Sequence, residues 1–386
     1  MPAMRFVFLS ACFGMLLFGI SFITLGSVAP GLQTKFHLDP VSSGALFSLL
    51  PFGIMAGSLL FGPFADRYGY KIILLSSCFS MFAGFQGIAY ASSLELLKVC
   101  VFLFGLGGGA INGACNAVVS DITKINKGAN LSLLGVFFAI GALGMPFILG
   151  TLEKEFSFQV IVSSVGYLTL LAAVLFIFTR FPDPKQTKGV PVSRVWELVK
   201  DYLLLLIGFF LFCLSSFESI INNWTTTYLL NKTPVSTSEA LYALSWYVAS
   251  MATMRLILGS AFRQISARVI LILSFVLQLA GCGLMQFSTS YFSSVAGLIL
   301  IGAGLASGFP VMLGFVGDRY AAVSGTAFSI VISIALVGNM AVNYLMGILA
   351  KQFGIQHLTT LVFTLTVFML LLSVTILKKL KTLNKT

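Results

Sequence analysis

One acidic side chain lies deep inside an apolar stretch, where it could serve proton chemistry. This residue is Glu218, whereas the other eleven Asp and Glu residues lie near the ends of apolar stretches or between them. A carboxylate at the centre of a membrane costs at least about 2.5–3.5 kcal/mol, so Glu218 needs a wet cavity or a polar partner. Because burial favours the neutral form, we expect Glu218 to bind and release a proton. The alternative is a neutral Glu218 that is hydrogen-bonded between two helices.

The residues that follow Glu218 could bind a solute. Asn222 is four residues further on, so both side chains fall on one face of a helix. Asn223 is adjacent to Asn222, and two neighbouring amides predict a discontinuity in this helix. Acids and amides bind hydroxyl groups, and the indole of Trp224 could stack on a sugar. That indole could equally anchor the helix at the membrane surface.

Further amides occur at helical spacing in other apolar stretches. Asn112 and Asn116 are four residues apart, and Asn339 and Asn343 repeat this spacing later in the chain. We expect both pairs to face a cavity, although bonds between helices are the alternative for each. Three other residues are candidates for lining the same cavity: Ser21, Trp246 and Tyr247.

Glycine and proline shape two of the apolar stretches. The run that begins Gly105-Leu-Gly-Gly-Gly follows no strand and lies inside an apolar stretch. Close helix packing therefore explains it better than a nucleotide-binding loop. Pro310 has no backbone N–H and predicts a kink in a later stretch.

Long apolar stretches must position these side chains. Of the 386 residues, 58% are hydrophobic and 9% are charged, with a mean hydropathy of +1.00, whereas a soluble domain is about 25% charged. A membrane span needs roughly 20 apolar residues. The sequence therefore predicts an all-α membrane protein with twelve transmembrane helices. The expected spans are Phe6–Pro30, Val41–Phe61, Ile72–Ala91, Leu94–Val119, Leu131–Thr151, Phe156–Phe178, Tyr202–Leu229, Ala240–Ile257, Val269–Phe287, Tyr291–Phe315, Ala322–Leu349 and Leu358–Leu377.

A long polar connection divides these spans into two groups of six. It runs from Arg180 to Asp201 and is rich in proline and basic residues. We therefore predict an N-terminal six-helix bundle over residues 1–180, a linker over 181–201 and a C-terminal six-helix bundle over 202–386.

The two halves resemble one another at a constant offset. The glycine run around Gly105 recurs 197 residues later, and the same offset joins Asp121 to Asp318 and Lys71 to Arg268. We therefore predict two pseudo-symmetric bundles, a plan that many membrane transport proteins share.

Basic residues predict the orientation. The formal net charge is +11, but the bases lie in short loops between apolar stretches, which indicates membrane topology rather than nucleic-acid binding. With both termini in the cytoplasm, we expect all but five of the 23 Lys and Arg residues to face that side. The expected location is a bacterial inner membrane. The five outward residues would be Lys35, Lys98, Lys154, Lys232 and Lys351.

A charged motif lies between the second and third stretches. It reads Gly62-Pro-Phe-Ala-Asp66-Arg67-Tyr-Gly69-Tyr-Lys71 and resembles the G-x-x-x-D-R-x-G-x-K/R signature of the major facilitator superfamily. The resemblance implies the major facilitator fold and solute transport by alternating access. We expect Gly62 and Gly69 to permit a tight turn and close packing.

The same resemblance implies a latch on the cytoplasmic side. Asp66 would face the N-terminus of the helix expected near Ala322. Arg67 or Lys71 would pair with Asp121. The alternative is that the motif marks only a turn and the topology.

Finer features are similar to the fucose:proton symporter branch of sugar facilitators. They are the segment Gly107–Asn116, the pair Phe217-Glu218 and the region Gly308–Phe328. The resemblance implies a sugar substrate and proton coupling. Asn112 stands where that branch has an acid, so Glu218 would be the only intramembrane proton carrier. Facilitated diffusion and sodium coupling remain alternatives.

The predicted function is secondary active transport of a sugar or related small polar solute, proton-coupled through Glu218, by a monomer in lipid. The alternative is a major facilitator exporter of amphipathic drugs or lipids, whose cavity the 37 phenylalanines could line. A receptor or scaffold is a third hypothesis. We expect no enzyme activity, cofactor, metal or nucleic-acid partner, because no catalytic or metal-binding spacing occurs. The six cysteines are expected to pack in apolar surroundings.

Overall fold

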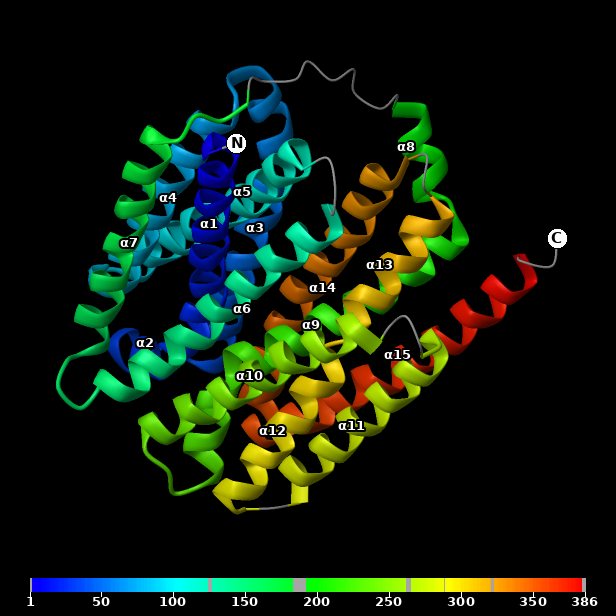
Figure 1. Cartoon of the computed structure of the whole chain (residues 1–386). Helices are drawn as coiled ribbons and strands as arrows, with labels where there is room; N and C mark the ends of the chain where they lie inside the picture. Colours follow the sequence, from blue (N-terminus) through cyan, green and yellow to red (C-terminus); the bar gives the residue numbers. More distant parts are fainter. Residues whose placement is uncertain are drawn as a thin grey trace. The chain divides into compact units, whose positions relative to one another are not determined.

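The computed structural model describes residues 2–123, 127–182, 192–261, 265–287, 289–320 and 323–383. Every regular element in these ranges is helical (Figure 1). Twelve spans in the described residues are long and apolar enough to cross a membrane. The predicted all-α fold with twelve spans is therefore confirmed, and the chain is an integral membrane protein.

Most spans are single helices. These are α1 (Pro2–Ser27), α3 (Pro40–Tyr68), α4 (Tyr70–Tyr90), α5 (Leu94–Ile122), α6 (Lys127–Leu152), α7 (Phe158–Phe178), α9 (Tyr202–Lys232), α10 (Thr237–Ala261), α11 (Ala267–Phe287), α14 (Ser324–Phe353) and α15 (Leu358–Leu383). The tenth span consists of α12 (Tyr291–Leu305) and α13 (Gly308–Arg319). Short elements precede or connect spans: α2 (Ala29–Phe36), α8 (Val192–Val199) and η2 (Ile355–His357).

Contacts divide the chain into two units. The first comprises Met1–Thr187 with Thr237–Ser245, and the second comprises Lys188–Ser236 with Trp246–Thr386. In the first unit, α5 packs against α1, α3 and α4, and α7 packs against α4. In the second unit, α9 packs against α14 and α15, and α11 packs against α12 and α15. The beginning of α10 groups with the half opposite to the one predicted for it.

Close helix contacts recur in both units at the predicted offset of 197 residues. A Cβ atom on Gly107 would lie 2.6 Å from the carbonyl oxygen of Ser77, and one on Gly304 would lie 2.7 Å from that of Ser274. Neither glycine can therefore carry a side chain unless the backbone moves. This pair of contacts joins α4 to α5 in one unit and α11 to α12 in the other.

A second pair of close helix contacts also recurs at the offset of 197 residues. A side chain on Gly105 would clash with the carbonyl oxygen of Leu50, and one on Gly302 would clash with that of Tyr247. The first contact joins α3 to α5, and the second joins α10 to α12. The glycine run thus serves helix packing, and the internal repeat seen in the sequence is also a repeat of packing.

The tenth span is interrupted at the place where Pro310 was expected to permit a kink. The helix is interrupted between Leu305 and Gly308, just before Pro310. Pro310 lacks an N–H, and its ring clashes with the carbonyl four residues earlier, which belongs to Ala306. The hydroxyl of Ser307, at the interruption, is hydrogen-bonded to the Ser274 hydroxyl over 2.5 Å.

The glycines of the charged motif play different roles. Gly69 separates α3 from α4 with a φ of 81°, a left-handed conformation that favours glycine. Gly62 lies inside α3, and a Cβ there would meet no atom within 4 Å. The prediction of a turn and close packing at Gly62 is therefore wrong, because α3 continues to Tyr68 before the chain turns.

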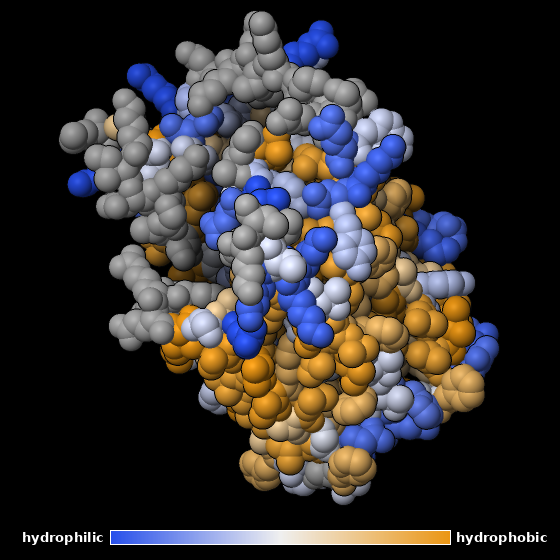
Figure 2. Space-filling model, turned by 90° about the vertical axis from the view of Figure 1, so that its right-hand side faces the viewer, coloured by the Kyte–Doolittle hydropathy of each residue, from blue (hydrophilic) through white to orange (hydrophobic). Residues whose placement is uncertain are grey.

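Large apolar side chains cover much of the exposed helix surface. They include Ile272, Val276 and Phe368, each more than half exposed. On the face in Figure 2, hydrophobic residues form a broad surface bordered by hydrophilic ones. Such a surface suits contact with lipid rather than with water.

Candidate functional site

An intramembrane ion pair is the centre of the candidate site. The Oε1 atom of Glu218 on α9 lies 3.9 Å from the Nη2 atom of Arg255 on α10, and both residues belong to spanning helices. The Glu218 side chain is 13% exposed and that of Arg255 is 32% exposed. The distance is at the long end for an ion pair, so the two groups attract each other without a tight hydrogen bond.

Sequence reasoning missed Arg255 as a partner, because it was counted with the cytoplasmic loop bases. A signal was available, since Arg255 lies inside the predicted span Ala240–Ile257. Bases within spans usually pair with acids or line a wet cavity. The offset of 197 residues also marks the pair: Ser21 and Ser58 stand at the equivalent positions of the first half. The charged pair therefore belongs to one repeat only.

Several buried polar atoms near this pair in the sequence have no hydrogen-bond partner among the described residues. They are Oδ1 of Asn222, one helical turn after Glu218, the hydroxyl of Tyr247, two turns before Arg255, and Nε of Arg255 itself. An unsatisfied buried polar atom costs about 1–3 kcal/mol, so such atoms call for a ligand or water. Asn222 and Tyr247, both predicted to bind a solute, thus each keep a polar atom with which to bind one.

The other predicted amides of the second unit satisfy one another. Asn343 donates to the Ser219 hydroxyl at 2.6 Å and to Oδ1 of Asn339 at 3.0 Å. Its own Oδ1 accepts from Asn223 at 3.2 Å and from the Trp224 indole at 3.3 Å. This amide cluster of Ser219, Asn223, Trp224, Asn339 and Asn343 is buried between α9 and α14.

The amide cluster bears on two predictions for α9: a discontinuity at the amides and the role of Trp224. Helix α9 is continuous from Tyr202 to Lys232, so the predicted discontinuity at the amides is wrong. Asn223 finds its partners through side chains and leaves the backbone ladder intact. Trp224 is only 1% exposed, which excludes its role as an anchor at the membrane surface.

The first unit holds the remaining amide pair. Asn116 donates to the backbone oxygen of Asn112 at 2.9 Å and to its Oδ1 at 3.0 Å, and both side chains are half-buried. Ser21 is buried, and its hydroxyl donates to the Phe18 carbonyl of its own helix. In the second unit, the side chain of Trp246 is 57% exposed. The Ser21 hydroxyl is therefore engaged within its own helix, and the Asn116 amide bonds to Asn112 on α5 and to the Met15 sulfur on α1 at 3.9 Å.

The charged motif forms bonds other than the expected latch. The Tyr70 hydroxyl donates to Oδ2 of Asp121 at 2.8 Å. Lys71 donates to the Ile177 carbonyl near the end of α7 at 2.8 Å, and the Arg67 guanidinium lies 5.2 Å from the centre of the Tyr68 ring. The expected pairing of Lys71 with Asp121 gives way to these contacts. The side chain of Asp66 lies outside the described residues, as do those expected near Ala322.

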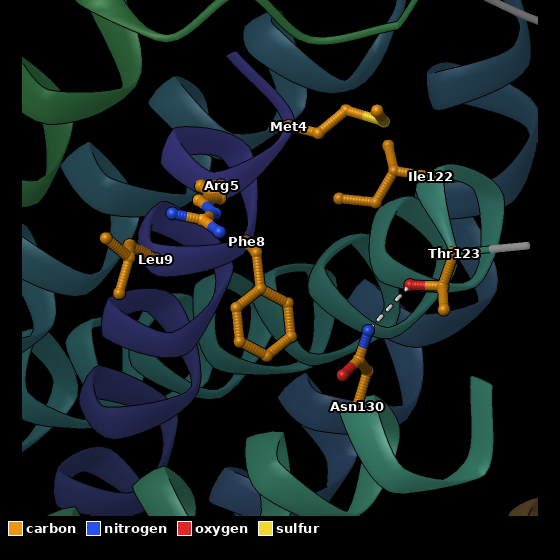
Figure 3. A pocket seen from close by; sticks show the side chains of 7 residues that line it. All are labelled: Met4, Arg5, Phe8, Leu9, Ile122, Thr123 and Asn130. Carbon is orange, nitrogen blue, oxygen red and sulfur yellow. Dashed lines mark hydrogen bonds between the residues drawn. The ribbon is translucent and has the colours of Figure 1, made fainter. Parts of the chain in front are cut away.

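A separate pocket opens in the first unit. It has a volume of about 460 Å³ and contains none of the predicted solute-binding residues. Figure 3 shows that α1 supplies Arg5 and Phe8, while Thr123 and Asn130 come from the end of α5 and the start of α6. Asn130 donates to the Thr123 hydroxyl at 3.1 Å, so the polar wall is internally bonded.

Within the described residues, no three His, Cys, Asp or Glu side chains come together as a metal site. All six cysteines are buried, as expected of packing residues. Among the described residues, the Glu218–Arg255 pair and the unpartnered atoms of Asn222 and Tyr247 are candidates for solute chemistry.

Known proteins resemble this chain in sequence and in fold. The 4-hydroxybenzoate transporter PcaK of Pseudomonas aeruginosa is 30% identical over 167 residues, which are 43% of this chain and 37% of that protein. The multi-drug resistance efflux pump PmrA of Streptococcus pneumoniae is 29% identical over 157 residues, 40% of this chain and 39% of the pump. Each match thus spans less than half of the relative.

A solved structure matches over nearly the whole length. A point mutant of the nucleoside transporter NupG superimposes with a TM-score of 0.81 at 16% identity, covering 97% of this chain and 99% of the other. This likeness concerns the fold. The sequence pattern of the Major Facilitator Superfamily matches residues 11–259, more than half of the chain. Together with the twelve spans, this match shows that the chain belongs to the Major Facilitator Superfamily.

Proposed function

We propose that this protein is a secondary transporter, not an enzyme, and that it moves a small polar solute by alternating access with proton coupling through Glu218. The observation that carries the proposal is the partly exposed ion pair between Glu218 and Arg255 inside spanning helices. Intramembrane ionisable residues mark substrate or proton pathways in membrane proteins. The protein works as a monomer in a bacterial inner membrane, with both termini in the cytoplasm.

The ion pair supplies a coupling mechanism. When Glu218 binds a proton, it loses its charge and its attraction for Arg255. The guanidinium is then left with an unsatisfied charge, which a solute can neutralise. Loss of the proton on the other side restores the ion pair and removes the solute's counter-charge. Proton and solute therefore move together, since each state of Glu218 has a different affinity for the solute.

A small carboxylate is the first candidate for the solute. Arginine binds carboxylates through two parallel hydrogen bonds, and Nε of Arg255 has no partner among the described residues. The amide of Asn222 and the hydroxyl of Tyr247 would orient the rest of the molecule. The named substrate of the 4-hydroxybenzoate transporter is also a small aromatic carboxylate.

A sugar is the second candidate, as the resemblance to the fucose:proton symporter branch implies. The unpartnered oxygen atoms of Asn222 and Tyr247 suit hydroxyl groups. The internal bonds of the amide cluster weaken this candidate, because Asn223 and Asn343 are already paired. Export of amphipathic drugs remains the alternative that the similarity to the efflux pump PmrA supports.

Uptake into proteoliposomes tests the proposal. We expect an inward proton gradient to drive accumulation of 4-hydroxybenzoate, and much less accumulation of its amide or of D-xylose. Glu218→Gln should abolish gradient-driven accumulation but spare solute exchange. Glu95→Gln, which changes an exposed acid at the start of α5, is the control. Full accumulation by Glu218→Gln would refute proton coupling, and preference for D-xylose would support the sugar candidate instead.

A further inference from the structure

An open groove runs between α11 and α15 in the second unit. It has a volume of about 470 Å³. Its floor contains the buried residues Leu271, Phe275 and Ser373, and its apolar walls are exposed or half-buried side chains. The Ser373 hydroxyl donates to a carbonyl of its own helix, so the floor presents no free donor. The remaining lining residues are Arg268, Ile272, Val276, Leu279, Leu370, Val374, Leu377 and Lys378.

The equivalent helix pair of the first unit explains why this groove is open. There, the rings of Phe82 on α4 and Tyr167 on α7 pack with centroids 5.4 Å apart. The residues 197 positions later are Leu279, which lines the groove, and Thr364. Two aromatic rings are therefore replaced by smaller side chains, and the space between the helices is left unfilled.

A hydrogen bond between the equivalent helices of the first unit also has no counterpart at Gly283. In the first unit, Ser163 of α7 donates to the Gln86 side chain of α4 at 2.9 Å. Gly283 stands at the position equivalent to Gln86, and a Cβ there would meet no atom within 4 Å. Helix α11 therefore has no side chain at this position with which to bridge to α15.

One end of the groove is strongly basic. Arg268 and Lys378 line it, both are exposed, and neither has a carboxylate within ion-pair distance among the described residues. The first unit uses the equivalent cation differently, because Lys71 donates to the Ile177 carbonyl of α7. The residue equivalent to Ile177 is Val374, which lines the groove. Lys71 thus bonds to a helix carbonyl in the first unit, whereas no such bond of Arg268 is found among the described residues of the second.

The length of the groove fits half a bilayer. From Arg268 to Leu279 the lining covers eleven residue steps, or about 16 Å at 1.5 Å per residue. The hydrocarbon core of a membrane is about 30 Å thick, so one leaflet is about 15 Å. The basic end lies on the side that the loop charges predict to be cytoplasmic.

We propose that this groove binds one anionic phospholipid of the cytoplasmic leaflet, with an acyl chain along α11 and α15 and the phosphate between Arg268 and Lys378. Basic pockets between spanning helices suit acidic headgroups. The two cations complement the negative charge, and the apolar walls match the chain. The proposal does not depend on the transported solute.

Lipid binding to the purified protein tests the proposal. We expect native mass spectrometry to show that phosphatidylglycerol binds at least about tenfold more tightly than phosphatidylethanolamine with the same acyl chains. Changing both Arg268→Gln and Lys378→Gln should weaken phosphatidylglycerol binding about 30-fold, since each cation near the surface is worth about 1 kcal/mol. Val276→Trp should block the groove and reduce binding of the acyl chain by a similar factor.

Lys379→Gln is the matched control, because Lys379 is an exposed neighbour of Lys378 that does not line the groove. It should leave binding unchanged. Equal binding of both lipids, or unchanged binding by the double variant, would overturn the proposal. If inorganic phosphate, which has no acyl chain, bound as tightly as phosphatidylglycerol, the groove would be a site for a free anion instead. A dimer that Val276→Trp dissociates would show that a second copy covers the groove.

Discussion

The carboxylate of Glu218 in α9 faces the guanidinium of Arg255 in α10 at 3.9 Å, inside the membrane-spanning part of the second unit. The equivalent positions of the first half hold two serines, Ser21 and Ser58. Ser21 donates to its own helix, and the Ser58 hydroxyl donates to the Gly109 carbonyl at 3.4 Å. The two repeats therefore share helix packing but differ in charge at these two positions.

Neutralising both members of this pair should cost less stability than neutralising Glu218 alone. Glu218→Gln leaves an arginine that cannot lose its charge, whereas Arg255→Gln leaves an acid that can bind a proton. We expect losses of roughly 1–3 kcal/mol for Glu218→Gln, less for Arg255→Gln, and partial recovery in the double variant. These values lie below the roughly 3–5 kcal/mol of fully buried pairs, because Arg255 is 32% exposed. Thermal unfolding in detergent measures them, and strictly additive losses would contradict the pairing.

Removing the Asn343 amide should destabilise the second unit. Asn343→Leu would leave Asn223, the Trp224 indole and the Ser219 hydroxyl without their shared partner. Because hydrogen bonds within membranes average about 0.6 kcal/mol, we expect a loss of roughly 2 kcal/mol in unfolding free energy. Asn231→Leu, on an exposed part of α9, should cost much less, since that amide bonds only its own helix. Equal losses would show that the amide cluster adds no stability.

Alanine at the two equivalent packing glycines should have equivalent effects. Gly107→Ala and Gly304→Ala would each press a methyl group against a serine carbonyl, at 2.6 Å and 2.7 Å. We expect each change to cost about 1–3 kcal/mol. Gly314→Ala in α13, where the methyl group would meet open space, should be neutral or slightly stabilising, because alanine favours helix. Melting temperatures of the three variants check this, and a stable Gly304→Ala would contradict the repeat of packing.

Alkaline pH should weaken the start of α9. The Tyr320 hydroxyl donates at 2.6 Å to Asp201, whose carboxylate also caps α9 through the Leu204 amide. Burial and the neighbouring Asp201 carboxylate raise the pKa of Tyr320 above its ordinary value of 10. The folded state therefore holds this proton more tightly than the unfolded state, so its stabilisation is complete below about pH 10 and is lost as the pH rises above it.

Two variants test this pH dependence through melting temperatures between about pH 9 and pH 11.5. Tyr320→Phe should be less stable than the wild type near neutral pH by about 0.5–1.5 kcal/mol, with a smaller loss on going to alkaline pH. Asp201→Asn keeps a capping side chain but removes the charge, so it should also reduce the alkaline loss. Unchanged alkaline behaviour of Tyr320→Phe would contradict the assignment.

The sequence by itself determined the twelve spans, the interruption before Pro310, the turn at Gly69 and the repeat offset of 197 residues. These features follow from local chemistry: apolar length, a missing N–H, a left-handed φ and the absence of a side chain at close contacts. Glu218 could be singled out for the same reason, because a carboxylate within an apolar stretch is visible without any coordinates.

Only the tertiary structure decided which polar groups meet. It paired Glu218 with Arg255, joined Asn223 to Asn343 across α9 and α14, and directed Lys71 to Ile177 rather than to Asp121. These partners are far apart in the chain, and their distances depend on how neighbouring helices rotate against each other. Residue type shows that a buried polar group needs a partner, but packing selects the partner.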